Sequence, residues 1–284
     1  ETPLIRLRFH PQGGIASLTD RKSNRDILKP ESRQGFFAGK IDGDDCESRG
    51  SWVIERAKGG APWAVARESG LIGGIPYQFE MIVRSDIPRL DCEVSFSFDG
   101  QRIGRLSDDQ RDSRSAFIHE DKLRFKIFPD VHNQAIGIRD LPFAVSETND
   151  RYVQGIYWTA ISDEAGGCAF FNRGAMGAVR ESDGGFSLPL AYAMYYIWGT
   201  RMLNGRFTYR FSLYPFSGRW ATADLHRRAL EYSYPCVGLC TPPGDGRLGN
   251  EFQILQPSSR NVILSALYPR NGSLYARFYE YRGE

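Results

Sequence analysis

The strongest constraint on the fold is the stretch Ile75–Gly100, where apolar and polar side chains alternate on both sides of a turn-like cluster. Alternation with a period of two sends one set of side chains to each face of a pleated strand. Ser85–Arg89 separates the two halves, and its Pro88 has no N–H to donate to a strand ladder. The apolar positions are Tyr77, Phe79, Met81 and Val83, then Leu90, Cys92, Val94, Phe96 and Phe98. The stretch therefore predicts a long antiparallel hairpin with one apolar and one polar face.

The same alternation recurs along the chain and predicts an all-β protein. Asp163–Gly166 and Pro269–Gly272 have the composition of hairpin turns, and the second contains Asn-Gly, a strong hairpin signal. We expect a polar loop over residues 40–51 and a surface loop over 105–115. Further strands are predicted at Ile5–Phe9, Leu123–Ile127, Tyr157–Ser162, Gly167–Asn172, Phe207–Leu213, Val262–Leu267 and Leu274–Tyr281. Strands at this spacing indicate a large antiparallel sandwich.

One short helix is predicted near residues 220–232, because Ala221, Leu225 and Ala229 recur at four-residue spacing. The main sandwich is predicted to span residues 1–240. Residues 241–284 are expected to form the start of a second β element or a closing hairpin, truncated at the C-terminal end. Thr241–Gly249, rich in Gly and Pro, is either a hinge or a long loop within one domain. Because the sequence starts ETPLIRLRF, without Met, we expect a fragment of a longer protein.

The charge balance argues against two classes of partner. Lys plus Arg is 36 and Asp plus Glu is 34, so the net charge is +2, and no basic stripe indicates a nucleic-acid partner. No apolar run reaches the roughly 18 residues that a membrane span requires. The five cysteines are an odd number without regular spacing, which argues against a disulfide framework and favours a reducing, cytoplasmic compartment. Cys236 and Cys240 lack the second pair of a four-cysteine zinc site, whereas Cys92 is predicted to be a buried thiol.

The residues alone identify no catalytic or metal-binding constellation. His10, His119, His132 and His226 share no metal-ligand spacing with one another, and each is expected to be a solvated or hydrogen-bonded surface histidine. His119-Glu120-Asp121 and Asp130-Val131-His132 are denser, and one of these histidines is an alternative candidate for a base or a ligand. There is no Gly-x-Ser-x-Gly elbow and no phosphate loop. Adjacent carboxylates on a strand point to opposite faces, so they do not form a glycosidase pair.

Clustered aromatic residues are the one sequence feature that suggests contact with a ligand. Tyr192–Trp198 and Tyr275, Tyr279 and Tyr281 place amphipathic rings in predicted strands. Such rings pack either within a sheet or against the C–H faces of sugars, and the sequence leaves both uses open.

Several stretches, taken together, resemble the C-terminal β-sandwich region of the family-38 glycoside hydrolases, the retaining class II α-mannosidases. The resemblance extends from about residue 13 to 281, and it is carried by the order of its segments. These segments are Gly14–Lys22 with Arg25–Leu28, Pro88–Glu93, Leu123–Asp130, Phe170–Gly174 through Gly184–Leu188, Phe207–Pro215 with Gly218–Trp220, and Asn261–Leu267.

The resemblance implies a galactose mutarotase-like super-sandwich that has no catalytic residue and no cofactor of its own. In this family the zinc ligands and the carboxylate nucleophile belong to an N-terminal catalytic domain, which would be the partner of this chain within one polypeptide. The sandwich would buttress that domain and contact a mannose-containing carbohydrate at its rim. The positions that match rim segments are Asp130, Asn172 and Arg173. Arg173 would donate to a hydroxyl of an outer sugar and Asp130 would accept from another, although pairing of Arg173 with a neighbouring carboxylate is an equal alternative.

Three rival functions stay open on the sequence. An independent carbohydrate-binding module would need an exposed aromatic platform. A mutarotase-like sugar epimerase would need His119 or His132 to converge with Glu120. A purely structural module would contact no sugar.

Overall fold

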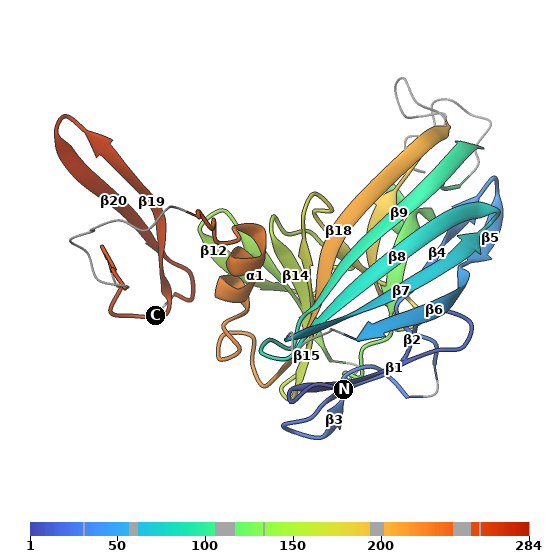
Figure 1. The fold of residues 1–284 in the computed structure, drawn as a ribbon, viewed down its shortest axis with the longest axis horizontal. Coiled ribbons are helices and arrows are strands. Elements are labelled where there is room, and N and C mark those ends of the chain that lie inside the picture. Colours follow the sequence, from blue (N-terminus) through green and yellow to red (C-terminus); the bar gives the residue numbers. More distant parts are fainter. Residues whose placement is uncertain are drawn as a thin grey trace.

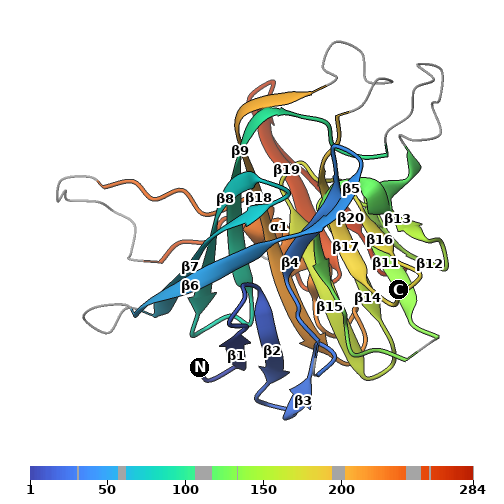
Figure 2. The ribbon, with the colours of Figure 1, turned by 90° about the vertical axis from the view of Figure 1, so that its right-hand side faces the viewer.

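The structure is a computed structural model that describes residues 1–30, 32–56, 62–105, 117–132, 134–193, 202–240, 251–255 and 257–283. Within these residues two large antiparallel sheets pack face to face (Figures 1 and 2). In spatial order, the nine-stranded sheet consists of β12 (Ala144–Thr148), β11 (Ile136–Leu141), β14 (Trp158–Ser162), β15 (Gly166–Asn172), β18 (Leu203–Ser217), β9 (Leu90–Gln101), β8 (Ile75–Arg84), β7 (Trp63–Ile72) and β6 (Arg49–Arg56). The predicted all-β sandwich is confirmed.

The second layer is a six-stranded sheet, and two smaller sheets complete the described part of the chain. In order, the six strands are β13 (Tyr152–Val153), β16 (Ala178–Arg180), β17 (Phe186–Ala191), β10 (Leu123–Ile127), β4 (Phe36–Ile41) and β5 (Asp44–Glu47). The small sheets are β1 (Ile5–Phe9) with β2 (Ile15–Asp20) and β3 (Arg25–Asp26), and the hairpin of β19 (Val262–Arg270) with β20 (Ser273–Glu280). No helix in the described residues is long and apolar enough to cross a membrane.

The main core lies between the two large sheets, where phenylalanine rings pack with Ile, Leu and Val side chains. Phe125 of β10 is fully buried at its centre, with its ring 4.8 Å from that of Phe211 and 5.6 Å from that of Phe37. All the apolar positions that were predicted to share one face of β8 and β9 are buried here, and so is the Cys92 thiol. Burial of apolar surface is the dominant stabilising contribution of such a core, at about 25 cal/mol for each Å² removed from water.

A second, smaller core forms on the outer face of the large sheet, where the α-helix of the described residues packs. In β15, Phe170 faces the main core and the next residue, Phe171, faces α1 (Leu225–Ser233). The helix begins at Leu225, later than the predicted Trp220, because Asp224 has the left-handed backbone conformation (φ 53°) that interrupts a regular helix. The predicted helix therefore exists, but its first predicted residues form turns.

The predicted polar loop over residues 40–51 is wrong. These residues end β4, form β5 and begin β6, and the first two strands pair across a tight turn at Asp42-Gly43, with φ values of 51° and 102°. Asp-Gly is a favoured sequence for such turns. β5 is an edge strand with solvent-exposed side chains, so its polar composition resembles that of a loop.

The C-terminal hairpin turns at Asn271-Gly272, as predicted, and stands away from the sandwich (Figure 1). The predicted hinge or loop at Thr241–Gly249 and most of the predicted surface loop at 105–115 lie outside the described residues. The division into residues 1–240 and 241–284 stays a prediction.

Candidate functional site

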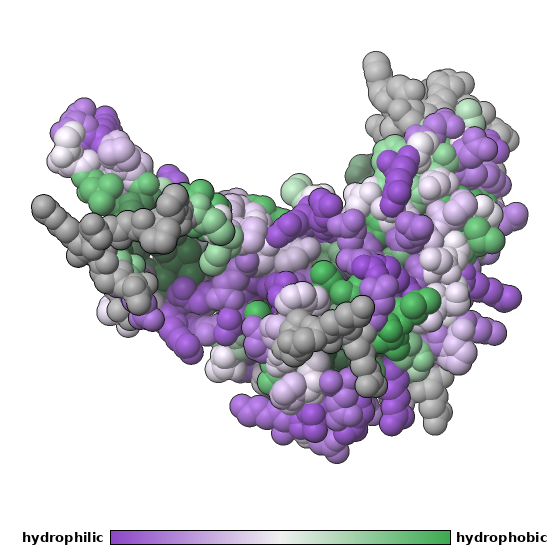
Figure 3. Space-filling model, viewed as in Figure 1, coloured by the Kyte–Doolittle hydropathy of each residue, from purple (hydrophilic) through white to green (hydrophobic). Residues whose placement is uncertain are grey.

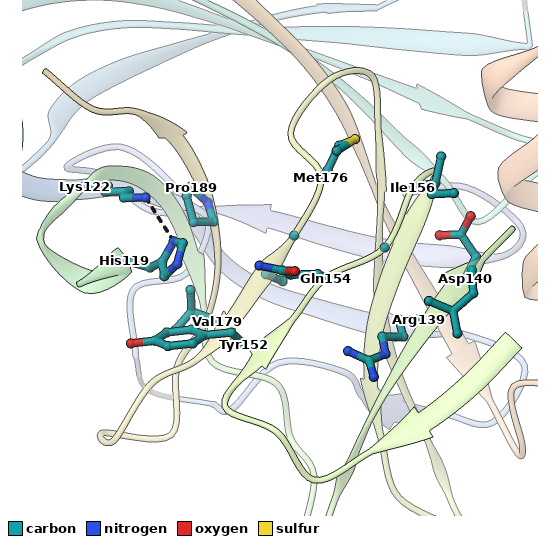
Figure 4. Close-up of a pocket in the computed structure, with 14 residues that line it drawn as sticks. His119, Lys122, Arg139, Asp140, Tyr152, Gln154, Ile156, Met176, Val179 and Pro189 are labelled. Atoms are coloured by element: carbon teal, nitrogen blue, oxygen red, sulfur yellow. Dashed lines mark hydrogen bonds between the residues drawn. The ribbon is translucent and has the colours of Figure 1, made fainter. Parts of the chain in front are cut away.

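A cavity of about 550 Å³ opens at the edge of the sandwich, where the ends of several strands meet (Figure 4). Its lining combines ionisable and amide side chains with apolar ones. The labelled side chains are His119, Lys122, Arg139, Asp140, Tyr152, Gln154, Ile156, Met176, Val179 and Pro189. A concave site with several perturbed ionisable groups is the first place to look for binding or chemistry.

His119 and Lys122 form one wall of this cavity. His119 begins the short 3-10 helix His119–Asp121, its Nδ1 lies 3.2 Å from Lys122 Nζ, and its ring lies 4.6 Å from that of Tyr152. Desolvation, and secondarily the Lys122 charge, lower the pKa of His119 to about 4. Desolvation also lowers the pKa of Lys122. Near neutral pH the imidazole is therefore uncharged, accepts from the ammonium at Nδ1 and carries its proton on Nε2.

Asp140 lies on the opposite wall from His119 (Figure 4). The residue is 1% exposed, and desolvation raises its pKa to about 6, although backbone hydrogen bonds oppose the shift. Its carboxylate accepts from the backbone N–H of Trp158 at 2.9 Å and of Tyr157 at 3.0 Å. Asp140 therefore anchors the start of β14 and is not a free general base. Other polar side chains of the cavity wall, His119, Lys122 and Gln154 among them, can hydrogen-bond a ligand.

The structure separates the three predicted rim residues into two places. The exposed Asp130 lies beside β3, where its backbone N–H donates to Ile27 and its carbonyl accepts from Arg25 at 2.6 Å. Arg25 also approaches Asp163, just before β15 begins. Asn172 and Arg173 lie at the other end of this seven-residue strand, about 20 Å away at about 3.3 Å per residue. They are brought together with each other but not with Asp130.

At the far end of β15 the two neighbouring residues have different surroundings. Asn172 is 2% exposed, and neither polar atom of its amide has a hydrogen-bond partner among the described residues. The Arg173 guanidinium lies 4.6 Å over the Tyr232 ring and donates to the Tyr232 carbonyl at the end of α1. Arg173 therefore satisfies a C-terminal carbonyl of the helix, an arrangement that stabilises helix ends.

The histidines and Glu120 do not converge on one site. Glu120 pairs with Arg151 and does not line the cavity that contains His119. His132 lines a different cavity, where its backbone N–H donates to Asp163. The expectation of a surface position for His226 is wrong: it is 2% exposed and lies between Trp158 and Tyr279. The helix that carries it is covered on one side by the sheet and on the other by the hairpin.

Sequence reasoning missed most of the cavity wall. Arg139 and Asp140 of β11 and Gln154, which follows β13, carry no motif, and only the folded chain brings them to one cavity with His119. In the aromatic stretch Tyr192–Trp198, residues 194–198 lie outside the described part of the chain, whereas the Tyr192 ring lies 5.1 Å from Lys122 Nζ. No group of three or more His, Cys, Asp or Glu side chains within the described ranges is arranged to hold a metal ion.

No protein-family model and no curated protein matches this sequence, whereas solved structures do match its fold. One is an alpha-mannosidase from Enterococcus faecalis V583, with a TM-score of 0.75, 11% identity, and coverage of 99% of this chain and 36% of that chain. Another is a protein in the Glycosyl Hydrolase Family 38 from Enterococcus faecalis, with a TM-score of 0.72, 12% identity, and coverage of 100% and 38%. The chain thus spans little more than a third of either protein. The resemblance seen in the sequence is confirmed at the level of the fold: the whole chain has the β-sandwich architecture of one part of these family-38 structures.

Proposed function

We propose that this chain is the non-catalytic sandwich of an α-mannosidase-like glycoside hydrolase, where it buttresses the catalytic domain and contributes to the sugar-binding rim. The observation that carries the proposal is the fold match, which covers the whole chain but 36% and 38% of the two similar proteins. A segment of that size is typical of one domain among several in a chain. The cavity supports the same reading, because its buried acid, Asp140, is held by backbone N–H groups.

A broad concave surface could contact such a catalytic domain. Figure 3 shows the molecule hollowed between the C-terminal hairpin and the half of the large sheet that carries β18 and β9, with hydrophilic side chains along the hollow. The outer face of this sheet carries paired charges, among them Arg210 of β18 with Glu93 of β9 at 2.6 Å, and Arg67 of β7 with Glu80 of β8 at 2.8 Å. A polar surface of this kind suits contact between domains of one chain.

The hairpin β19–β20 supplies an apolar contact surface for the same partner. On one face of the hairpin Leu274 is 59% exposed and Leu267 38%, and on the opposite face Tyr268 and Tyr275 stack at 5.8 Å. A two-stranded hairpin is marginally stable by itself, and clustered exposed apolar side chains mark interaction surfaces. In our proposal the catalytic domain of the same polypeptide, with its expected zinc site, covers this surface.

The rim residues keep the roles that the resemblance implies. Arg173 is exposed, and its backbone N–H donates to the Arg210 carbonyl of β18, a strand of the half-sheet beside the hollow. There its guanidinium would donate to a hydroxyl of an outer sugar, with Asn172 behind it. Asp130 would accept from a mannose hydroxyl at a separate part of the rim, because the strand β15 lies between the two places.

The non-catalytic role is tested with the chain alone. A chromogenic aryl α-mannoside is incubated with the purified protein, and the metal content is measured by elemental analysis. We expect no hydrolysis above the buffer rate and no stoichiometric zinc. Zinc-dependent turnover would overturn the proposal, because it would place the reaction within this chain.

The buttressing role is tested through the hairpin surface. We expect the isolated chain to bind an apolar dye and to self-associate in light scattering, and the double variant Leu267→Glu with Leu274→Glu to lose both behaviours. Val53→Glu is the matched control, since Val53 is 63% exposed on the edge strand β6 and outside the hairpin. A monomeric wild-type chain without dye binding would contradict an interface at the hairpin.

A further inference from the structure

A second cleft, of about 740 Å³, lies between α1, the hairpin β19–β20 and the turn that joins β11 to β12. It adjoins the cavity of His119, and Asp140, Leu141 and Ile156 line both. Its volume falls within the roughly 300–1,000 Å³ of small-molecule sites. Neither the fold comparison nor the proposed rim residues assign a role to this cleft.

Aromatic rings from four separate segments line the cleft in two edge-to-face pairs. Phe143 and Tyr279 have ring centroids 5.3 Å apart at 71°, and Tyr157 and Tyr234 have centroids 5.6 Å apart at 62°. The two phenol groups of the second pair also hydrogen-bond to each other. Tyr279 is fixed from behind, because His226 Nε2 lies 2.7 Å from its hydroxyl. The walls are therefore held in place before any ligand arrives.

In the turn at the cleft, Phe143 occupies a backbone conformation that usually requires glycine. Leu141 pairs with Ala144, so the turn consists of Pro142 and Phe143, and Phe143 has φ of 65°. Turns of this geometry place glycine there, because a side chain is strained in the left-handed region. The Phe143 ring is nevertheless 57% exposed. Backbone strain that holds an exposed ring at a cleft is typical of ligand clamps.

The charged groups at the cleft balance one another. Asp140 and Glu231 contribute two acids, and Arg227 and Arg277 contribute two guanidinium groups. His226 adds no charge near neutral pH, because burial and the neighbouring Arg227 lower its pKa to about 4. Arg277 uses its Nε to donate to Ser265 Oγ at 3.0 Å, at the cleft wall. This balance favours a neutral ligand with many hydroxyl groups over an anion or a cation.

We propose that this cleft is a carbohydrate-binding site for a neutral pyranose. The C–H face of the sugar would pack on Phe143 and the neighbouring tyrosine rings, and the tyrosine hydroxyls and Arg277 would bond its hydroxyl groups. The choice of mannosides as first probes rests on the proposed function. The proposal of a sugar site rests on the rings and charges that line the cleft.

Phe143→Gly tests the site, because it removes the ring and also relieves the backbone strain. Binding of methyl α-D-mannopyranoside, an α-linked mannobiose, and the matching glucosides and galactosides is measured by calorimetry and saturation-transfer NMR. We expect the wild-type chain to bind at least one of these sugars, and the variant to bind it roughly tenfold more weakly or not at all, the effect of one lost ring contact. The melting temperature of the variant should stay within a few degrees of the wild type.

Phe117→Gly is the matched control, because Phe117 is 65% exposed and does not line the cleft. It should leave sugar affinity unchanged. Equal affinities of the wild type and Phe143→Gly would overturn the site, as would the absence of binding to every sugar. If mannoside binding survives Phe143→Gly, the cleft proposal fails and the proposed function stands. If the chain hydrolyses the aryl mannoside, the proposed function fails, and the comparison of the wild type with Phe143→Gly still decides whether the cleft binds sugar.

Discussion

The sandwich and the C-terminal hairpin are both antiparallel β structures, but they are stabilised in different ways. In the sandwich two sheets cover each other, and rings such as Phe125, Phe79 and Phe170 are fully buried between them. The hairpin β19–β20 has no second sheet in the described part of the chain, and Leu274 and Phe278 remain 59% and 44% exposed. Most of its strand residues are exposed or half-buried.

The hairpin is attached instead by a few directional contacts around α1. Tyr279 bonds His226, the Arg282 guanidinium bonds Asp224 at 2.7 Å and the Ala221 carbonyl at 2.6 Å, and Arg227 donates to the Arg260 carbonyl at 2.9 Å. Apolar burial is non-directional and insensitive to pH, whereas hydrogen bonds and ion pairs depend on single groups and their protonation. We therefore expect the sandwich to fail as a whole and the hairpin to release locally.

Phe125→Ala should produce the largest effect, because it empties the centre of the sandwich. The ring lies 4.8 Å from that of Phe211 and 5.8 Å from that of Phe79, and such truncations cost about 3–5 kcal/mol. Urea unfolding at 25 °C measures the loss. Tyr268→Ala on the hairpin is the comparison and should cost less than about 1 kcal/mol. Similar losses for the two variants would contradict the distinction between the regions.

Acid should destabilise the protein through His226. Burial, and secondarily Arg227, lower the pKa of this imidazole in the folded chain to about 4, from its ordinary value of 6.5. Between these pH values the unfolded chain binds a proton that the folded chain does not, so stability present above pH 6.5 is lost as the pH falls towards 4. The loss is about 3 kcal/mol at the lower limit. Urea unfolding at several pH values measures it.

His226→Gln separates this titration from the others. Asp140 and His119 also have shifted pKa values, but they titrate in both chains and cancel in the comparison. The variant should lose less stability than the wild type between pH 6.5 and 4. Parallel pH profiles of the two chains would show that His226 is not the group that titrates.

Arg282→Met should loosen the hairpin without affecting the sandwich. The side chains of Arg282 and Asp224 are 17% and 13% exposed, so loss of the pair is worth about 2 kcal/mol, or roughly thirtyfold in the local opening equilibrium. Hydrogen exchange should accelerate by about that factor for amides of β19 and β20 only. Arg260→Met is the control, because Arg260 is 82% exposed and lies 3.5 Å from the same carboxylate. Uniform acceleration across both sheets would refute local release.

Glu93→Gln should have the smallest effect. The ion pair of Glu93 with Arg210 is short, at 2.6 Å, but its side chains are 46% and 58% exposed on the outer face of the sandwich. Exposed pairs contribute about 0–1 kcal/mol and are screened by salt. The difference in urea unfolding between variant and wild type should shrink further in 0.5 M salt. A loss above about 2 kcal/mol, the free energy expected for local opening in Arg282→Met, would reverse the proposed ranking of the polar contacts.

Much of the fold was predictable from local patterns. The alternation in β8 and β9 fixed which side chains face the core, and Asn271-Gly272 fixed the last hairpin, because pleat and turn conformation are properties of neighbouring residues. The errors have local causes as well. The hairpin at Asp42-Gly43 resembles a loop in sequence because the exposed edge strand β5 is polar. The four-residue spacing predicts too early a start for α1 because spacing does not reveal the backbone conformation of Asp224.

The sequence by itself determined the period, the turns and hence the all-β class of this protein. The tertiary structure alone decided which distant side chains meet. Asp130 and Asn172 fall at opposite ends of β15, His119 and Asp140 face each other across one cavity, and His226 becomes buried once the hairpin covers α1. The physical reason is that the pleat depends on adjacent residues, whereas sites depend on the order of strands within a sheet, which the packing of the whole chain sets.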